Sequence, residues 1–126
     1  MKGIVVTPEN EVTIQDFDAP IYRSTAEVTG GFEIVHPRGL PQPYCMIVDD
    51  DGLRKKEPLN AIGSIFYETH KHGSPIVGTI VIMKQGFGPD GADIIGLDSE
   101  DIDALLPRIK TLANGLPAPA ERNEQA

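Results

Sequence analysis

The side chains with the greatest chemical potential in this sequence are three histidines and a run of three aspartates. His36, His70 and His72, together with Asp49–Asp51, are the only set that could be assembled into a metal site. His70 and His72 stand beside glycine and proline, where polar side chains are usually solvated, and no His-Glu-x-x-His or Cys-x-x-Cys spacing accompanies them. We therefore expect no metal site. A small metal-dependent hydrolase built on these residues is the weakest of three functional hypotheses.

Two loops contain spacings that invite comparison with ligand-binding motifs. In Asp49–Gly52 the glycine is fourth and Asn60 is twelfth, whereas an EF-hand calcium loop needs glycine sixth and glutamate twelfth. The segment 86–91 lacks the Gly-Lys-Ser/Thr ending of a phosphate-binding P-loop, and Pro89 removes one N–H donor. We expect a β-turn in the first and a flexible inter-strand loop in the second. Neither supplies a catalytic residue or a cofactor site.

The charge balance narrows the classes of partner. The chain has 19 acidic and 11 basic residues and a formal net charge of −8, which disfavours direct binding to nucleic acid or to an anionic membrane. No apolar run approaches the roughly 20 residues that a membrane helix needs. Cys45 is the single cysteine and lies in a strand pattern, which fits a reducing cytoplasm better than a disulfide framework. The acidity leaves open a second hypothesis, an anti-restriction-type inhibitor that imitates DNA.

Apolar periodicity predicts the elements that must position these residues. Strands are expected over residues 2–7, 11–17, 32–36, 44–48, 76–83 and 93–95. Helices are expected after Asp18, over 61–69 with Asn60 as the N-cap, and over 98–114 with Asp98 as the N-cap. The segment 70–75 should break the second helix, and Pro107 should kink or divide the last one.

The strongest strand pattern sets the expected fold. Residues 76–83 are nearly continuous in β-branched side chains, which is typical of a central strand covered on both faces. We predict an α+β fold in which a mostly antiparallel sheet packs against two or three helices, in a single domain over residues 1–115. Residues 116–126 lack apolar periodicity and are predicted to form a disordered C-terminal tail.

Six short segments occur in an order that resembles a known family. They are Lys2-Gly3-Ile4-Val5-Val6, Gly30-Gly31-Phe32-Glu33-Ile34-Val35, Met46-Ile47-Val48-Asp49-Asp50-Asp51-Gly52-Leu53, Pro58-Leu59-Asn60, Pro75-Ile76-Val77-Gly78-Thr79-Ile80-Val81-Ile82, and Gly96-Leu97 before an acidic helix. Over residues 2 to about 112, this order resembles a small family of bacterial and phage proteins known as a domain of unknown function, number 3846. The chain departs from the family pattern at residues 40–43 and in its proline-rich tail.

The resemblance implies an accessory protein, often of phage or plasmid context, with no catalytic residues. Our leading hypothesis is therefore a non-enzymatic binding or interaction protein, monomeric or a small homo-oligomer, whose partner is an unknown protein or a small polar ligand. We expect Asn60 to cap its helix and, with Tyr44 and Asp51, to border a groove for that ligand. Gly78 would allow a backbone to approach closely.

Overall fold

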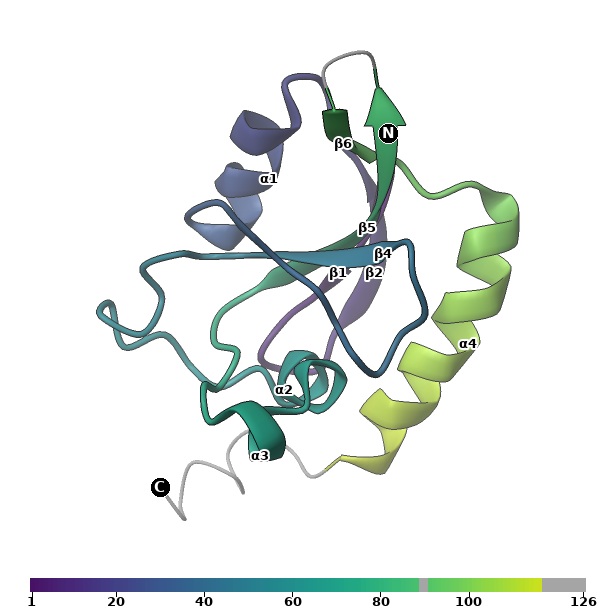
Figure 1. Ribbon diagram of the computed structural model, residues 1–126. Coiled ribbons are helices and arrows are strands. Elements are labelled where there is room, and N and C mark those ends of the chain that lie inside the picture. Colours follow the sequence, from purple (N-terminus) through teal and green to yellow (C-terminus); the bar gives the residue numbers. More distant parts are fainter. Residues whose placement is uncertain (89–90, 117–126) are drawn as a thin grey trace.

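The computed structural model of the protein describes residues 1–88 and 91–116 and contains four helices and a six-stranded sheet within them (Figure 1). The strands are β1 (Lys2–Val6), β2 (Val12–Asp16), β3 (Glu33–Val35), β4 (Tyr44–Val48), β5 (Ile80–Gly88) and β6 (Gly91–Ile95). The helices are α1 (Ile21–Thr29), α2 (Ala61–Tyr67), α3 (Thr69–His72) and α4 (Ser99–Gly115). The predicted α+β fold class is confirmed.

All strand pairs are antiparallel, and β5 lies at the centre of the sheet. The order is β2-β1-β5-β4-β3, and β6 pairs with the C-terminal half of β5. The first half of β5 pairs with β1 on one side and with β4 on the other. This order leaves β3 at one end of the sheet, where it pairs only with β4.

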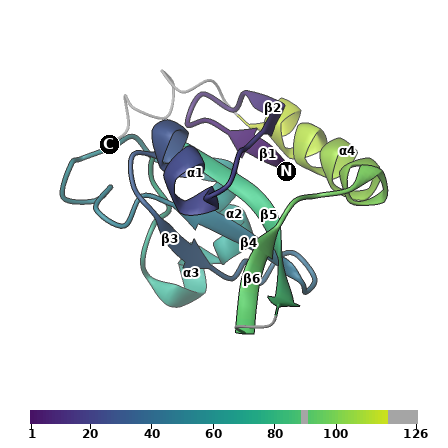
Figure 2. The same cartoon turned by 90° about the horizontal axis from the view of Figure 1, so that it is seen from above.

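The first four residues of β5 are buried on both faces of the sheet, as the β-branched pattern predicts. Ile80, Val81, Ile82 and Met83 have no exposed surface. Because successive side chains of a strand point to opposite faces, Ile80 and Ile82 pack into a cluster with α2 and α4, whereas Val81 and Met83 pack into a second cluster that α1 covers. The helices therefore lie on both faces of the sheet (Figure 2).

The structure corrects several predicted boundaries. Strand β5 begins at Ile80 rather than at residue 76 and continues to Gly88, so the first part of the predicted flexible loop is paired with β6. Residues 69–72 form the short helix α3 rather than a break. Helix α4 runs unbroken through Pro107, so the expected division is wrong. Helix α1 begins after Pro20 without a side-chain cap, and Asp18 supplies a backbone carbonyl to the Ser24 hydroxyl instead.

Two helix starts agree with the sequence. Asp98 caps α4 by accepting a hydrogen bond from the Asp101 amide, and the Asp101 carboxylate accepts one from the Asp98 amide. Asn60 caps α2 through the Gly63 amide. In the part of the chain that is described, no helix is both long enough and apolar enough to cross a membrane. The predicted tail lies outside the described residues, apart from Leu116.

Double-sided burial of β5 makes a specific prediction. Val81→Asp would place a carboxylate where no water reaches it, a penalty of several kcal/mol against a total stability of roughly 5 to 15 kcal/mol. We expect insoluble or unfolded protein, measured by circular dichroism and gel filtration. The matched control is Thr13→Asp on the exposed edge strand β2. Val5 pairs with Thr13 on one side and with Val81 on the other, so the two substituted positions lie in the same row of the sheet. A folded Val81→Asp protein with an unchanged thermal midpoint would contradict the assigned core.

Candidate functional site

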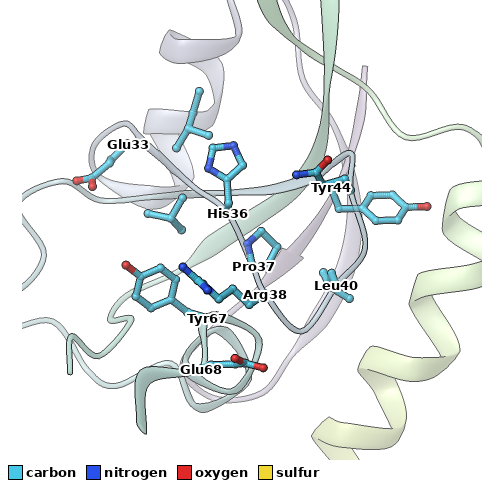
Figure 3. A pocket seen from close by; sticks show the side chains of 11 residues that line it. Glu33, His36, Pro37, Arg38, Leu40, Tyr44, Tyr67 and Glu68 are labelled. Carbon is cyan, nitrogen blue, oxygen red and sulfur yellow. The ribbon is translucent and has the colours of Figure 1, made fainter. Parts of the chain in front are cut away.

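A hollow of the described surface runs beside the edge strand β3. It consists of two neighbouring pockets of about 860 Å³ and about 410 Å³, which share Glu33, Val35 and Tyr67. We call the two together the β3 groove. The larger pocket is bordered on one side by residues 33–38, from β3 and the loop after it, and on the other by Tyr67, the last residue of α2, and Glu68, its C-cap (Figure 3).

The alternation of β3 and the rigid loop after it shape this groove. Ile34 packs with the cluster under α1, so Glu33 and Val35 face the opposite side of the sheet. All three residues border the larger pocket, whereas only Glu33 and Val35 of this strand also border the smaller one. Pro37 is buried and ends the strand, because it cannot donate a ladder hydrogen bond. The Gly39 amide then donates to the Phe66 carbonyl at 2.8 Å, and the Arg108 guanidinium donates to the Gly39 carbonyl at 2.8 Å.

Some charged and polar side chains of the groove form hydrogen bonds or ion pairs within the protein, and others do not. Arg38 and Glu33 are exposed, and neither forms a hydrogen bond or ion pair within the described residues through its side chain. His36 is hydrogen-bonded through Nε2 to Gln85 Oε1 at 2.6 Å, and Glu68 lies 3.5 Å from the Lys71 ammonium. In Figure 3 the Arg38 side chain extends toward the Tyr67 ring. The larger pocket therefore presents an unpaired cation beside an aromatic side chain.

The smaller pocket lies on the acidic turn after β4. Asp51 accepts hydrogen bonds from the Arg54 guanidinium, and these bonds lower the pKa of Asp51. Asp50 is exposed and accepts a hydrogen bond from the Phe32 amide at 3.3 Å. The Asp50 side chain thus holds the turn to the N-terminal end of β3, and the Asp51–Arg54 ion pair lies within the turn. The Gly52 amide donates to the Asp49 carbonyl at 3.3 Å, which is the hydrogen bond of the predicted β-turn.

Beneath this turn two carboxyl groups share a buried site. Burial alone would raise the pKa of Asp49, but hydrogen bonds from Lys55 Nζ at 2.9 Å and from the Asp51 amide outweigh it and lower that pKa. Burial, followed by a hydrogen bond to Asp49, raises the pKa of Glu57. Glu57 Oε2 is buried without a hydrogen-bond partner in the described residues. Asp49 therefore retains its charge more readily than Glu57.

Asn60 is a structural centre rather than a wall of the groove. It has no exposed surface, and Oδ1 accepts from the Gly63 amide at 2.9 Å. Nδ2 donates to the carbonyls of Val6 at 3.0 Å and Gly78 at 2.9 Å, so one side chain joins α2, β1 and the segment before β5. The structure thus brings Asn60 and Gly78 together, but neither lines the β3 groove.

Tyr44 and Asp51 do border the groove, one in each pocket. The Tyr44 hydroxyl donates to Asp101 Oδ1 at 2.8 Å; burial, followed by this hydrogen bond, raises the pKa of Tyr44 to about 12. Lys84 Nζ lies 2.6 Å from Asp101 Oδ2, so the same carboxylate joins β4 and β5 to α4. The Tyr44 hydroxyl is therefore engaged within the fold, and its side chain extends toward α4 (Figure 3).

The sequence did not indicate Glu33, Arg38 or Tyr67 as site residues, and it indicated His36 only as a candidate metal ligand. The groove depends on β3 being an edge strand and on α2 ending opposite it, which no local spacing encodes. One signal was present, since Arg38 stands between Pro37 and Gly39, away from any acidic neighbour in sequence. Among the described residues, no group of three or more His, Cys, Asp or Glu side chains is arranged to hold a metal ion.

The position of Gly78 over Glu57 yields a second prediction. Gly78 has a φ of 77°, and a Cβ there would overlap Glu57 Oε2. Gly73 has a φ of 84°, with nothing within 4 Å of its Cβ position. We expect Gly73→Ala to lower the free energy of unfolding by about 1 to 2 kcal/mol, the cost of a left-handed backbone, and Gly78→Ala to lower it by clearly more. Urea denaturation measures both. Equal losses would show that Glu57 moves aside freely.

The buried carboxyl pair yields a third prediction. A raised folded-state pKa means that the contribution of Glu57 to stability is complete below its unfolded pKa of about 4.3 and is lost as pH rises through the folded-state pKa. Glu57→Gln cannot ionise, so its thermal midpoint relative to the unaltered protein should rise as pH increases above 4 and level off once pH exceeds the folded-state pKa of Glu57. Glu33→Gln, at an exposed acid, should show no such trend. A Glu57→Gln protein that loses relative stability with rising pH would contradict the assignment.

Comparison with known proteins places the chain in a family. A family model described as "Domain of unknown function (DUF3846)" matches residues 1–110, which include the whole β3 groove, the Asp49–Glu57 pair and Asn60. No curated protein and no solved structure gives a significant match. The resemblance predicted from six short segments is confirmed, because the match spans most of the chain: the protein belongs to the DUF3846 family, a domain of unknown function.

Proposed function

We propose that the protein is a non-enzymatic binding protein whose β3 groove takes an extended segment of a partner protein. The segment would add a strand to the free edge of β3. The observation that carries this proposal is that the unpaired edge of a sheet lies along a groove, with side chains from α2 and the acidic turn on the far side. Tyr44 and Asp51 mark its two pockets.

The backbone amide and carbonyl groups on the free edge of β3 can pair with a further strand. β3 pairs with β4 on one side, and no backbone hydrogen bond outside the regular elements involves residues 33–35 in the described chain. An edge of this kind is a template for strand addition, in which main-chain hydrogen bonds give affinity and pockets for alternate side chains give specificity. The three-residue length of β3 limits unspecific pairing, so selectivity would come from the groove.

The shape of the groove favours an extended polypeptide over a small molecule. Sites for small molecules bury about 70 to 90% of the ligand surface. Here Glu33, His36 and Arg38 are all exposed, and two pockets follow one another past Val35 and Tyr67 rather than closing into one cavity. A chain lying along β3 would use both pockets.

The alternative of a DNA-imitating inhibitor receives less support. Such a protein needs free carboxylates spaced along one face like phosphates. Asp49 is paired with Lys55, Asp51 with Arg54 and Asp101 with Lys84, so three acids are already neutralised internally. A role as an accessory protein in the bacterial cytoplasm, encoded by a phage or plasmid, accords with a binding function and belongs to the same proposal.

A random octapeptide display library tests the proposal. Peptides enriched on the immobilised full chain should be rich in β-branched and aromatic residues, and titrating one of them should shift the amide NMR signals of residues 33–38 and 67–68. N-methylation of the peptide at successive positions is the sharper probe. Only alternate amides face β3 in a strand, so affinity should fall about tenfold or more at every second position and change little between them.

Two controls make the result decisive. Tyr22→Ala removes a side chain that is 55% exposed on α1, on the opposite face of the sheet, and should leave peptide affinity unchanged. Val35→Arg should weaken binding, because it fills the junction of the two pockets. The proposal is wrong if no peptide is enriched, if N-methylation has no two-residue period, or if the shifted signals lie on α1.

A further inference from the structure

The unpaired charges of the β3 groove have opposite signs in different parts of it. Arg38, which borders only the larger pocket, has no anionic partner within the described residues. Glu33, at the junction of the two pockets, and Asp50, in the smaller pocket, have no cationic partner there. Other charged side chains around the groove are matched, since Asp51 pairs with Arg54 and Glu68 with Lys71.

The backbone of Arg38 is held in place by the residues on either side of it. Pro37 before it is buried, and Gly39 after it is hydrogen-bonded to the Phe66 carbonyl and to Arg108. The Arg108 guanidinium also lies over the Phe66 ring, 5.9 Å from its centroid. Because the backbone directly after Arg38 is hydrogen-bonded to α2 and α4, and Pro37 before it is buried, the Arg38 side chain extends into the groove from a fixed backbone position (Figure 3).

From this arrangement we infer that the bound segment carries an acidic side chain opposite Arg38 and a basic side chain opposite Glu33 and Asp50. The inference rests on the proposed function and names the class of segment that the groove selects. A planar guanidinium binds a carboxylate through two parallel hydrogen bonds, and opposite charges placed along an interface fix register more than they add affinity.

The spacing of the two charges in the segment follows from β3. Glu33 and Arg38 are five positions apart in the sequence, and a strand rises about 3.3 Å per residue, which sets an upper limit of about 17 Å. Pro37 ends the strand before Arg38, so the path is shorter than that limit. The basic and acidic residues should therefore stand about four positions apart, with a side chain between them that contacts Tyr67.

A charge-reversal selection tests this inference. The same octapeptide library is selected separately on the unaltered protein, on Arg38→Glu and on the double variant Glu33→Lys/Asp50→Lys, with folding checked by circular dichroism. The unaltered protein should enrich an acidic residue at one position and a basic residue about four away. Arg38→Glu should turn the acidic preference basic and keep the other, and the double variant should do the reverse.

Synthetic peptides then give the size of the effect. Arg38→Glu should weaken binding of the peptide selected on the unaltered protein at least tenfold, and exchanging the peptide's acidic residue for lysine should restore it. Lys110→Glu, at an exposed position of α4 away from the groove, makes the same change in net charge and should leave both preferences unaltered. This control separates a local contact from general electrostatics.

The outcomes distinguish the inference from the function on which it rests. Peptides that show the two-residue N-methylation period but no switch of charge preference on Arg38→Glu would overturn the inference and leave the binding function standing. A switch that Lys110→Glu also produces would overturn it equally. If the library yields no binding peptide, both are wrong.

Discussion

The complete burial of the first four residues of β5 between two layers of helices is the constraint on which the rest of the structure depends. Four consecutive residues, Ile80–Met83, are excluded from water on both faces, so β1 and β4 must flank them and helices must cover each side. With β5 central, β2 pairs only with β1 and β3 only with β4, so these two strands lie at the two ends of the main path of the sheet. The free edge of β3, beside which the groove lies, therefore depends on the position of β5.

Much of the fold was predictable because its signals are local. Alternating and continuous apolar runs gave the strands, Asn60 and Asp98 gave two helix starts, and the six family segments gave the family. The errors arose where tertiary pairing overrides local preference. Gly86 belongs to a strand because β6 pairs with it, and Pro107 stays within α4, whose buried Leu105 and Ile109 fix that helix to the core.

The site was less predictable than the fold, for a related reason. Of the four residues chosen from the sequence, Tyr44 and Asp51 border the groove, whereas Asn60 and Gly78 hold together the segments behind it. A buried asparagine with three hydrogen bonds and an exposed cap look alike in sequence, since both precede a helix. The remaining groove residues come from segments about thirty positions apart, such as Arg38 and Tyr67, and only the sheet order brings these together.

The hydrogen bonds of Gly39 have a consequence for the thermodynamics of any encounter at this surface. The loop over residues 37–43 is tied to α2 through Phe66, to α4 through Arg108 and to β5 through the bond from the Gln85 amide to the Pro43 carbonyl. Its conformational entropy is therefore surrendered during folding rather than on contact with another molecule. Because this wall of the groove is preorganised, its backbone loses little conformational entropy when a ligand binds, and the incoming chain bears most of that entropic cost.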